Sequence, residues 1–283
     1  MFASLALLLA AAQPQADAVA LVSACAGKDG WDEPAPPARI HGSTYYVGTC
    51  GISAILITSP RGHVLIDGGT ERAAPLIAAN VERLGFRMRD VRLILNSHEH
   101  HDHAGGIGAL QRLSGAAVRV RAAARAAFAG GRPQAGDPQY GVLEPFPAAT
   151  LGRPLRDSEV VRVGPIRLTA HATPGHSPGS TSWRWRSCEG RVCHDIVYAD
   201  SISAISAEGY RFSDHPAYVA TFRRSLARIG GLRCDLLLTP HPSASRLFER
   251  LASGRLSDAA ACRDYAVGGV ARLDARLARE AAR

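Results

Sequence analysis

The chain is poor in lysine and in aromatic residues. Lys28 is its single lysine, so arginine supplies the other 32 of its 33 basic residues, and aromatic residues make up 6% of the 283 positions. The formal net charge is +8, but the arginines are spread along the chain and form no stripe. Nucleic-acid grooves usually combine basic side chains with aromatic rings that stack on bases. We therefore expect no nucleic-acid partner.

Long apolar runs are also missing, except for a short one near the start. The run from Phe2 to Ala12 is shorter than the roughly 20 residues that a membrane-spanning helix needs. Small residues follow it, as in a secretory signal peptide, although no Lys or Arg precedes it. We expect residues 1–20 to be this signal peptide, with cleavage after Ala12, Ala16 or Ala20. Residues 21–283 then form one domain with no stable membrane association.

The redox and zinc-ribbon types of cysteine pair are absent as well. The six cysteines form an even set without a C-x-x-C pair, and their spacing alone does not decide the pairing. Cys188 and Cys193 flank a short turn between two strand-like runs, so their bridge is the one that spacing favours. Six free thiols would suit a cytosolic protein but fit poorly beside a secretory leader. We expect disulfides and a periplasmic or secreted protein.

Metal-binding residue types are concentrated at residues 98–103, which read His-Glu-His-His-Asp-His. The segment follows an apolar strand-like run and precedes a Gly-Gly turn, whereas solvated histidine tracts are usually low-complexity tags. His98 and His100, two apart on extended backbone, point the same way and can hold one ion. Asp102 and His103 then turn toward a neighbouring ion. The segment therefore predicts a site for two metal ions.

Two more histidines lie where a dinuclear site would need them. His176 lies in a turn between strand-like segments, and His241 follows the strand-like run Leu236–Leu238. Either one alone could be an ordinary loop or core histidine. Together with the first motif, they complete three ligands for each of two metals. Three protein ligands leave positions open for water and substrate, which is typical of a catalytic site.

Strand-like and helical periodicities alternate along the chain, and no change of composition marks a linker. We expect an α+β fold in which two mixed β-sheets pack face to face with helices on both outer faces, an αββα sandwich. Strand-end residues from the two halves would meet in one seam. The Gly- and Pro-rich stretch 130–147 is a candidate loop over the site. The predicted strands are 44–47, 52–58, 63–66, 91–95, 117–120, 160–163, 166–170, 181–185, 196–198 and 236–238, and the main helices are 73–84, 107–113, 122–129 and 216–229.

Three segments resemble a known family. HEHHDHAGG at 98–106, TPGHSPGSTSW at 173–183 and LLLTPHP at 236–242 resemble the metallo-β-lactamase fold superfamily, and most closely the third, dizinc subclass of class B β-lactamases. The likeness covers nearly the whole mature chain. It implies that His98, His100 and His176 hold one zinc ion, that Asp102, His103 and His241 hold a second, and that the disulfides pair Cys25 with Cys50, Cys188 with Cys193 and Cys234 with Cys262.

The resemblance also implies a substrate and a mechanism. Ser201 and Ser203 match serines that help to bind the substrate carboxylate, with ordinary loop serines as the alternative, and Gln139 is a candidate rim contact. A hydroxide activated by two zinc ions would attack the β-lactam carbonyl without an acyl-enzyme, and Asp102 would ligate zinc and orient that hydroxide. We expect a secreted, monomeric, zinc-dependent β-lactamase that acts on a small-molecule substrate.

Three positions depart from the family pattern or leave it open. Glu99 and His101 replace residues that are usually small or apolar, and we expect both to face away from the metals. An aspartate in the segment of Asp200 bridges the metals in glyoxalase II-like hydrolases and lactonases. The alternative function is therefore another secreted dizinc hydrolase, a lactonase or a glyoxalase II-like thioesterase. A non-catalytic zinc-binding or nucleic-acid-processing protein is a third possibility.

Overall fold

Two mixed β-sheets form the centre of the structure, a computed structural model that describes residues 17–282. The first sheet contains, in spatial order, β1 (Ala38–His41), β2 (Thr44–Tyr46), β3 (Ile55–Ile57), β4 (His63–Ile66), β5 (Val91–Leu95) and β6 (Ala117–Val118). The second contains β11 (Leu236–Leu238), β10 (Val192–Tyr198), β9 (Thr181–Glu189), β8 (Ile166–Ala172) and β7 (Val160–Val163). The β4–β5, β5–β6 and β10–β11 pairs are parallel, and the other pairs are antiparallel.

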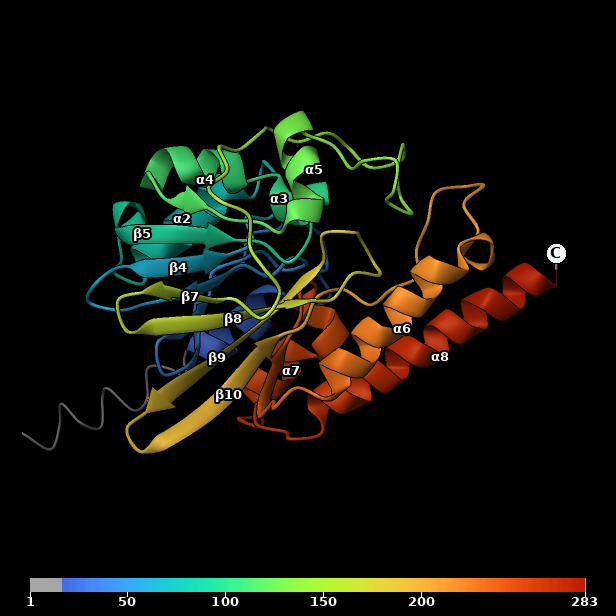
Figure 1. The fold of residues 1–283 in the computed structure, drawn as a ribbon. Helices are drawn as coiled ribbons and strands as arrows, with labels where there is room; N and C mark the ends of the chain where they lie inside the picture. The colour runs from blue at the N-terminus through green and yellow to red at the C-terminus, as the bar shows by residue number, and fades with distance from the viewer. Residues whose placement is uncertain (1–16, 283) are drawn as a thin grey trace, which may run out of the picture.

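Three apolar clusters hold the layers together. Along β3, Ile55 and Ile57 pack between the two sheets, whereas Leu56 points to the outer face and packs with the first-sheet helices α2 (Ala74–Arg83) and α4 (Ile107–Ser114). The helices α6 (Pro216–Gly230) and α8 (Ala261–Ala281) cover the outer face of the second sheet through a third cluster. Figure 1 shows α2 and α4 on one side of the sheets and α6 and α8 on the other. The predicted αββα sandwich is confirmed.

Strand direction brings the loops of interest to one edge. β4 and β5 run parallel, so their carboxyl ends meet at the same edge of the first sheet. In the second sheet β8, β10 and β11 run in one direction, since β9 is antiparallel to both of its neighbours. Two hydrogen bonds tie the edges of the two sheets together, from Thr181 N to Ser97 O at 2.7 Å and from Trp183 Nε1 to Asn96 O at 2.9 Å. These bonds form the predicted seam.

Several details differ from the predicted elements. Strand β1 was not predicted, although Ala38 and Ile40 are buried in the alternating pattern of a strand. The segment predicted as one helix at 122–129 is a 3₁₀ turn, Ala122–Ala124, followed by α5 (Arg125–Gly130). The remaining short helices are α3 (His101–Ala104) and α7 (Leu247–Ala252), with 3₁₀ turns at Met88–Asp90, Phe212–Asp214 and Pro242–Ser245. Within residues 17–282, no helix is both long enough and apolar enough to span a membrane.

Three disulfides are present among the described residues, with the pairing that the resemblance implied. They join Cys25 to Cys50, Cys188 to Cys193 and Cys234 to Cys262. Cys188 and Cys193 are directly paired across the β9–β10 hairpin. The expected signal peptide lies mostly outside the described residues. Its last positions, 17–20, belong to a helix over 17–24 in which Ala18 is buried.

Candidate metal centre

The segment 98–103 leaves the end of β5 and runs directly into helix α3. His100 is still extended, with φ −86° and ψ 153°, and precedes the first helical residue. His98 and His100 therefore lie on the extended part, whereas Asp102 and His103 lie in the first turn of α3. The change from extended to helical backbone is what turns the second pair of side chains toward a separate position. The prediction from spacing matches this geometry.

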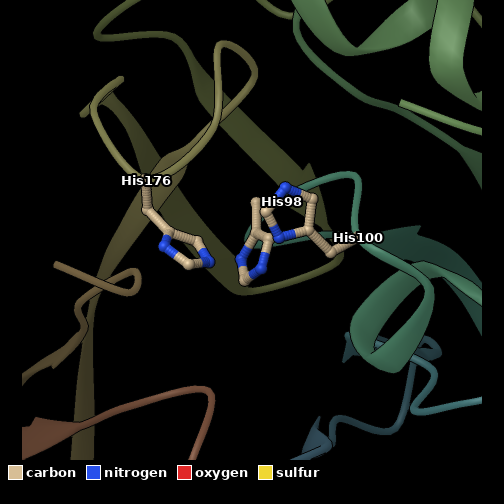
Figure 2. Close-up of side chains that lie close together, drawn as sticks. All are labelled: His98, His100 and His176. Atoms are coloured by element: carbon tan, nitrogen blue, oxygen red, sulfur yellow. The ribbon is translucent and has the colours of Figure 1, made fainter. Parts of the chain in front are cut away.

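The first candidate group is formed by His98, His100 and His176. Ring centroids are 4.6 Å apart for His98 and His100 and 4.8 Å apart from each of these to His176. One nitrogen from each ring can be chosen so that all lie within 4.8 Å of one another. Figure 2 shows His98 and His100 from one loop facing His176 from another. The structure therefore brings together the three predicted ligands of the first metal.

The second candidate group is centred on the carboxylate of Asp102. Its Oδ2 lies 3.0 Å from His103 Nε2 and 3.4 Å from His241 Nε2, and the two imidazole rings are 5.0 Å apart. His98, Asp102 and His103 also form a group whose ligand atoms all lie within 4.8 Å. His98 belongs to both groups, so the two positions are adjacent. The predicted second set is thus assembled beside the first.

Each ring of the first group is oriented by a polar group on its outer nitrogen. The contacts are His98 Nδ1 with Asp200 Oδ1 at 2.8 Å, His100 Nε2 with Asp137 Oδ2 at 2.9 Å, and His176 Nδ1 with the Ser203 carbonyl oxygen at 3.0 Å. Outer contacts of this kind set the tautomer and the ring orientation of metal-binding histidines. They leave the other nitrogen of each ring for a metal.

The protonation states suit a metal. Burial lowers the pKa of His98 well below its ordinary value, and burial with the neighbouring His98 and His100 lowers the pKa of His176 to about 3. Burial acts to raise the pKa of Asp102, but His103 and His241 hold it well below its usual range. His98 Nε2 is buried and has no hydrogen-bond partner among the described residues. Burial acts to lower the pKa of His103, but the carboxylate of Asp102 raises it. Neutral imidazoles at His98 and His176 and a carboxylate anion at Asp102 are donors that fit zinc.

Glu99 faces away from the metal groups, as predicted, but it is buried. Ser177 Oγ donates to Glu99 Oε2 at 2.8 Å, and Gly179 N donates to Oε1 at 2.7 Å. A Cβ atom on residue 179 would lie 2.3 Å from Glu99 Oε2, so only glycine allows this approach. Glu99 therefore joins the segment of His98 and His100 to the loop of His176. His101, the other departure, lies in neither metal group, and its ring packs at a tilt against Trp31, with ring centroids 5.3 Å apart.

Asp67 supports the second group from the end of β4. It has a positive φ of 65°, which is rare for a residue other than glycine and marks local strain. Its carboxylate accepts hydrogen bonds from Ser97 N, Ser97 Oγ and the Tyr198 hydroxyl, and its Oδ2 lies 3.7 Å from His103 Nδ1. Burial outweighs these contacts and raises the pKa of Asp67 to about 6. Asp67 thus fixes the start of the metal-binding loop.

The geometry agrees with the comparison to known families. The profile of the metallo-beta-lactamase superfamily matches residues 47–241, which include all six predicted metal ligands. The chain belongs to the metallo-beta-lactamase superfamily. This membership confirms the predicted family.

Solved metallo-β-lactamases share the fold over nearly their full length. MIM-1 from Novosphingobium pentaromativorans is 52% identical, with a TM-score of 0.91 over 93% of this chain and 98% of that chain. MEM-A1, a subclass B3 enzyme from a soil metagenome library, is 46% identical, with a TM-score of 0.86 over 89% of this chain and 99% of that chain. The predicted likeness to the third subclass is therefore confirmed.

A hydroxyacylglutathione hydrolase is a more distant relative. The enzyme from Anaeromyxobacter dehalogenans strain 2CP-C is 30% identical over 59% of this chain and 52% of its own length. The chain therefore spans about half the length of the curated relatives it matches. This relative represents the class of hydrolase that an Asp200 bridge between metals would indicate.

Asp200 lies beside the first metal group, and its Oδ2 is buried without a hydrogen-bond partner among the described residues. Its Oδ1 contacts the outer nitrogen of His98. Its backbone N–H donates a hydrogen bond to Ser182 Oγ at 3.0 Å. The Tyr265 hydroxyl donates to its carbonyl oxygen at 3.2 Å. These contacts make Asp200 an orienting partner of His98.

The predicted substrate contacts lie in two places. Ser201 and Ser203 line a cavity of about 670 Å³ that His241 also lines, so they are close to the second metal group. Ser203 Oγ also lies 3.0 Å from His176 Nδ1. Gln139 is buried in the 130–147 loop, and its backbone N–H donates to Asp137 Oδ1 at 2.8 Å. Substrate binding by these three residues stays a proposal.

Two orienting residues were missed by the sequence analysis. Asp67 follows β4 in Asp67-Gly68-Gly69, and an acidic residue at the end of a strand parallel to β5 was a usable signal. Asp137 lies in an irregular loop, 34 positions after His103 by sequence number (137 − 103), and neither periodicity nor motif marks it. Only the folded loop reveals its contact with His100.

Proposed function

We propose that the protein is a secreted zinc-dependent β-lactamase. The observation that carries the proposal is the pairing of two adjacent metal groups with the serine-lined cavity beside His241. His98, His100 and His176 would hold one zinc ion, and Asp102, His103 and His241 the other. Bound there, two zinc ions would supply a hydroxide at neutral pH and polarise the lactam carbonyl. The predicted monomer and the small-molecule substrate remain part of this proposal.

The side chains of the protein would orient the reactants. Asp102 Oδ2 lies 3.0 Å from His103 and 3.4 Å from His241, which would leave Oδ1 to orient the attacking water. Ser201 and Ser203 would donate hydrogen bonds to the carboxylate of the substrate, and Gln139 would contact its rim. No side chain is needed as a covalent nucleophile, so no acyl-enzyme forms.

A hydrolysis panel with and without chelator tests the function. Purified protein should open a carbapenem and a cephalosporin, and dipicolinate or EDTA should abolish the activity until zinc is added back. Inhibitors that acylate serine should have no effect. Activity that survives complete metal removal would exclude the proposal.

A second candidate function is supported by the relationship to hydroxyacylglutathione hydrolase. This function is hydrolysis of a thioester or lactone at the same centre. An acyl-homoserine lactone and an acylglutathione belong in the same panel. Preference for either over every β-lactam would favour the second candidate, because kcat/KM measures relative stabilisation of the competing transition states.

We further propose export through the predicted signal peptide. Ala18 and Leu21 are both buried in the cluster between the sheets, on the helix 17–24. Cleavage after Ala20 would remove one of these core residues, so cleavage at Ala12 or Ala16 is favoured. The intact mass of protein recovered from the periplasm measures the site directly. A mass that begins at residue 21 would contradict this choice.

A further inference from the structure

The cavity beside the metal centre extends well beyond the predicted serines. Its volume is about 670 Å³, and it reaches from Ser201, Ser203 and His241 to the side chains of Arg246 and Arg272. Arg272 lies on α8 and Arg246 lies between the 3₁₀ turn Pro242–Ser245 and α7. Neither arginine forms an ion pair or a side-chain hydrogen bond with any residue in 17–282. Both arginines are exposed, line the cavity and have no carboxylate partner among the described residues.

The Arg272 guanidinium lies beside a glycine on its own helix. An added Cβ on Gly268 would lie 3.2 Å from Arg272 Nη1, so the guanidinium lies over this bare position one turn earlier. Gly268 itself lines the cavity, so the exposed Arg272 lies beside a lining position.

Arg246 is held in an unusual backbone conformation. Its φ is 52° and its ψ is 42°, a left-handed geometry that residues with a side chain rarely adopt. The turn is stabilised locally, because Arg246 N donates to Ser243 O and Arg250 N donates to Arg246 O. This turn directs residue 246 to the wall of the cavity, five positions after His241 (246 − 241).

The other charged residues of the wall already have partners. Arg250 donates to the carbonyl oxygens of Leu237 and Leu256. Asp258 Oδ1 accepts a hydrogen bond from Ala260 N, and Asp264 pairs with Arg263 at 3.5 Å. Arg246 and Arg272 are therefore the charged groups of this wall that remain for a ligand.

We propose that this part of the cavity is an anion subsite of the substrate pocket. Arg246 and Arg272 bind a second acidic group, carried on a substituent of the β-lactam, in addition to the ring carboxylate that Ser201 and Ser203 bind. A guanidinium recognises a carboxylate or sulfonate through paired N–H donors. The substrate class is thus β-lactams with a carboxylate or sulfonate on the substituent. The inference rests on the proposed function.

The test compares two substrates across matched variants. The substrates are cephalosporins with the same ring and acylamino group, one with a neutral second substituent and one with a carboxylate on it. The variants are Arg272→Ala and Arg246→Ala, with Arg279→Ala as the control, since Arg279 is an exposed arginine of α8 that does not line the cavity. All are assayed as zinc-loaded, full-length mature proteins.

Each of the two test variants should lower kcat/KM for the dianionic substrate about fivefold, as expected for one partly exposed charge pair. The value for the neutral-substituent substrate should change less than about twofold. High salt should reduce the preference of the wild type for the dianion, because the Debye length falls to about 3 Å at 1 M. Arg279→Ala should behave as the wild type does with both substrates.

Three results would overturn the subsite. Equal losses of kcat/KM on both substrates would assign the arginines to the ring carboxylate. An effect of Arg279→Ala as large as that of the test variants would show only a long-range electrostatic effect. Unchanged kinetics in the test variants would show that the arginines have no role. If the wild type hydrolyses neither substrate, the proposed function fails. Calorimetric titration with phthalate then decides the subsite separately: weaker binding by Arg272→Ala than by Arg279→Ala supports it, and equal binding refutes it.

Discussion

At the scale of single residues, the histidines of the first candidate group depend on polar groups that contact their outer nitrogens. Asp200 orients His98 and Asp137 orients His100, each through a carboxylate on the outer nitrogen. Glu99 acts through the backbone, because it accepts a hydrogen bond from Gly179 N in the loop that carries His176. Mutation of such partners typically reduces metal affinity or activity by about 10–100-fold. The ligand set alone therefore does not determine how tightly this centre binds zinc.

The substitution Glu99→Gln tests this view of the loop. The amide keeps one oxygen for Ser177 or Gly179 and loses the second acceptor, so the loop of His176 should loosen. We expect zinc affinity at the first position to fall about 10-fold, measured by competition with a chromophoric chelator. Glu82→Gln, at an exposed position of α2, is the matched control. Lower unfolding free energy with unchanged zinc affinity would show that Glu99 only stabilises the fold.

Sequence reasoning found the groups that touch the proposed metals better than the groups that position them. The histidines and Asp102 lie in a short motif or next to the ends of strands, and the apolar runs predict those strands. Asp137 could not be found in this way, because its contact with His100 depends on the path of an irregular loop. Glu99 was predicted to face away, but its burial and its two loop contacts depend on where Gly179 comes to lie.

At the scale of elements, helix α8 links the serine segment to the rest of the second sheet. Near the end of the helix, Glu280 accepts hydrogen bonds from Phe212 N at 3.1 Å and Ser213 N at 2.7 Å. Arg276, one turn earlier, donates to Glu280 and to the carbonyl oxygens of Ala204 and Tyr210. The segment that follows Ser203 is therefore fastened to α8. No sequence pattern indicated this connection, because the irregular segment takes part in it through backbone N–H and carbonyl groups.

Glu280→Gln should destabilise the protein in a pH-dependent way. Burial acts to raise the pKa of Glu280, but the hydrogen bonds from Ser213 and Arg276 outweigh it and lower the pKa to about 2, from an ordinary 4.5. A carboxyl whose folded-state pKa is depressed contributes stability above its unfolded pKa and loses it as pH falls. We expect about 2 kcal/mol less unfolding free energy at pH 7, with the difference shrinking below pH 4.5 and vanishing near pH 2.

Urea unfolding at a series of pH values measures this difference. Glu208→Gln, at an exposed position of the neighbouring loop, removes the same charge without these contacts and should stay near the wild type. A difference that is constant from pH 7 to pH 2 would show that the carboxylate charge of Glu280 is not what stabilises the helix end.

At the scale of the whole molecule, the centre is assembled from both sheets, so its geometry depends on how the two halves are held together. The seam contributes direct hydrogen bonds, such as Thr181 N to Ser97 O. The disulfides add covalent limits on the unfolded chain, with separations of 25 residues for Cys25–Cys50, 28 for Cys234–Cys262 and 5 for Cys188–Cys193. Spacing favoured only the shortest bridge, whereas the resemblance implied all three.

The contribution of each bridge should follow the length of the chain that it closes. Chain-entropy arguments give about 3.5 kcal/mol for loops of 25 and 28 residues and about 2 kcal/mol for one of 5. Replacing Cys234 and Cys262 by serine should therefore lower the unfolding free energy more than replacing Cys188 and Cys193.

The Cys234–Cys262 bridge also anchors α8, which carries Arg272 and contacts Asp200 through Tyr265. We expect that variant to lose zinc affinity, while the hairpin variant retains it. Chelator competition and urea unfolding on the two double variants decide the matter, and equal zinc affinity in both would show that α8 does not transmit its position to the centre.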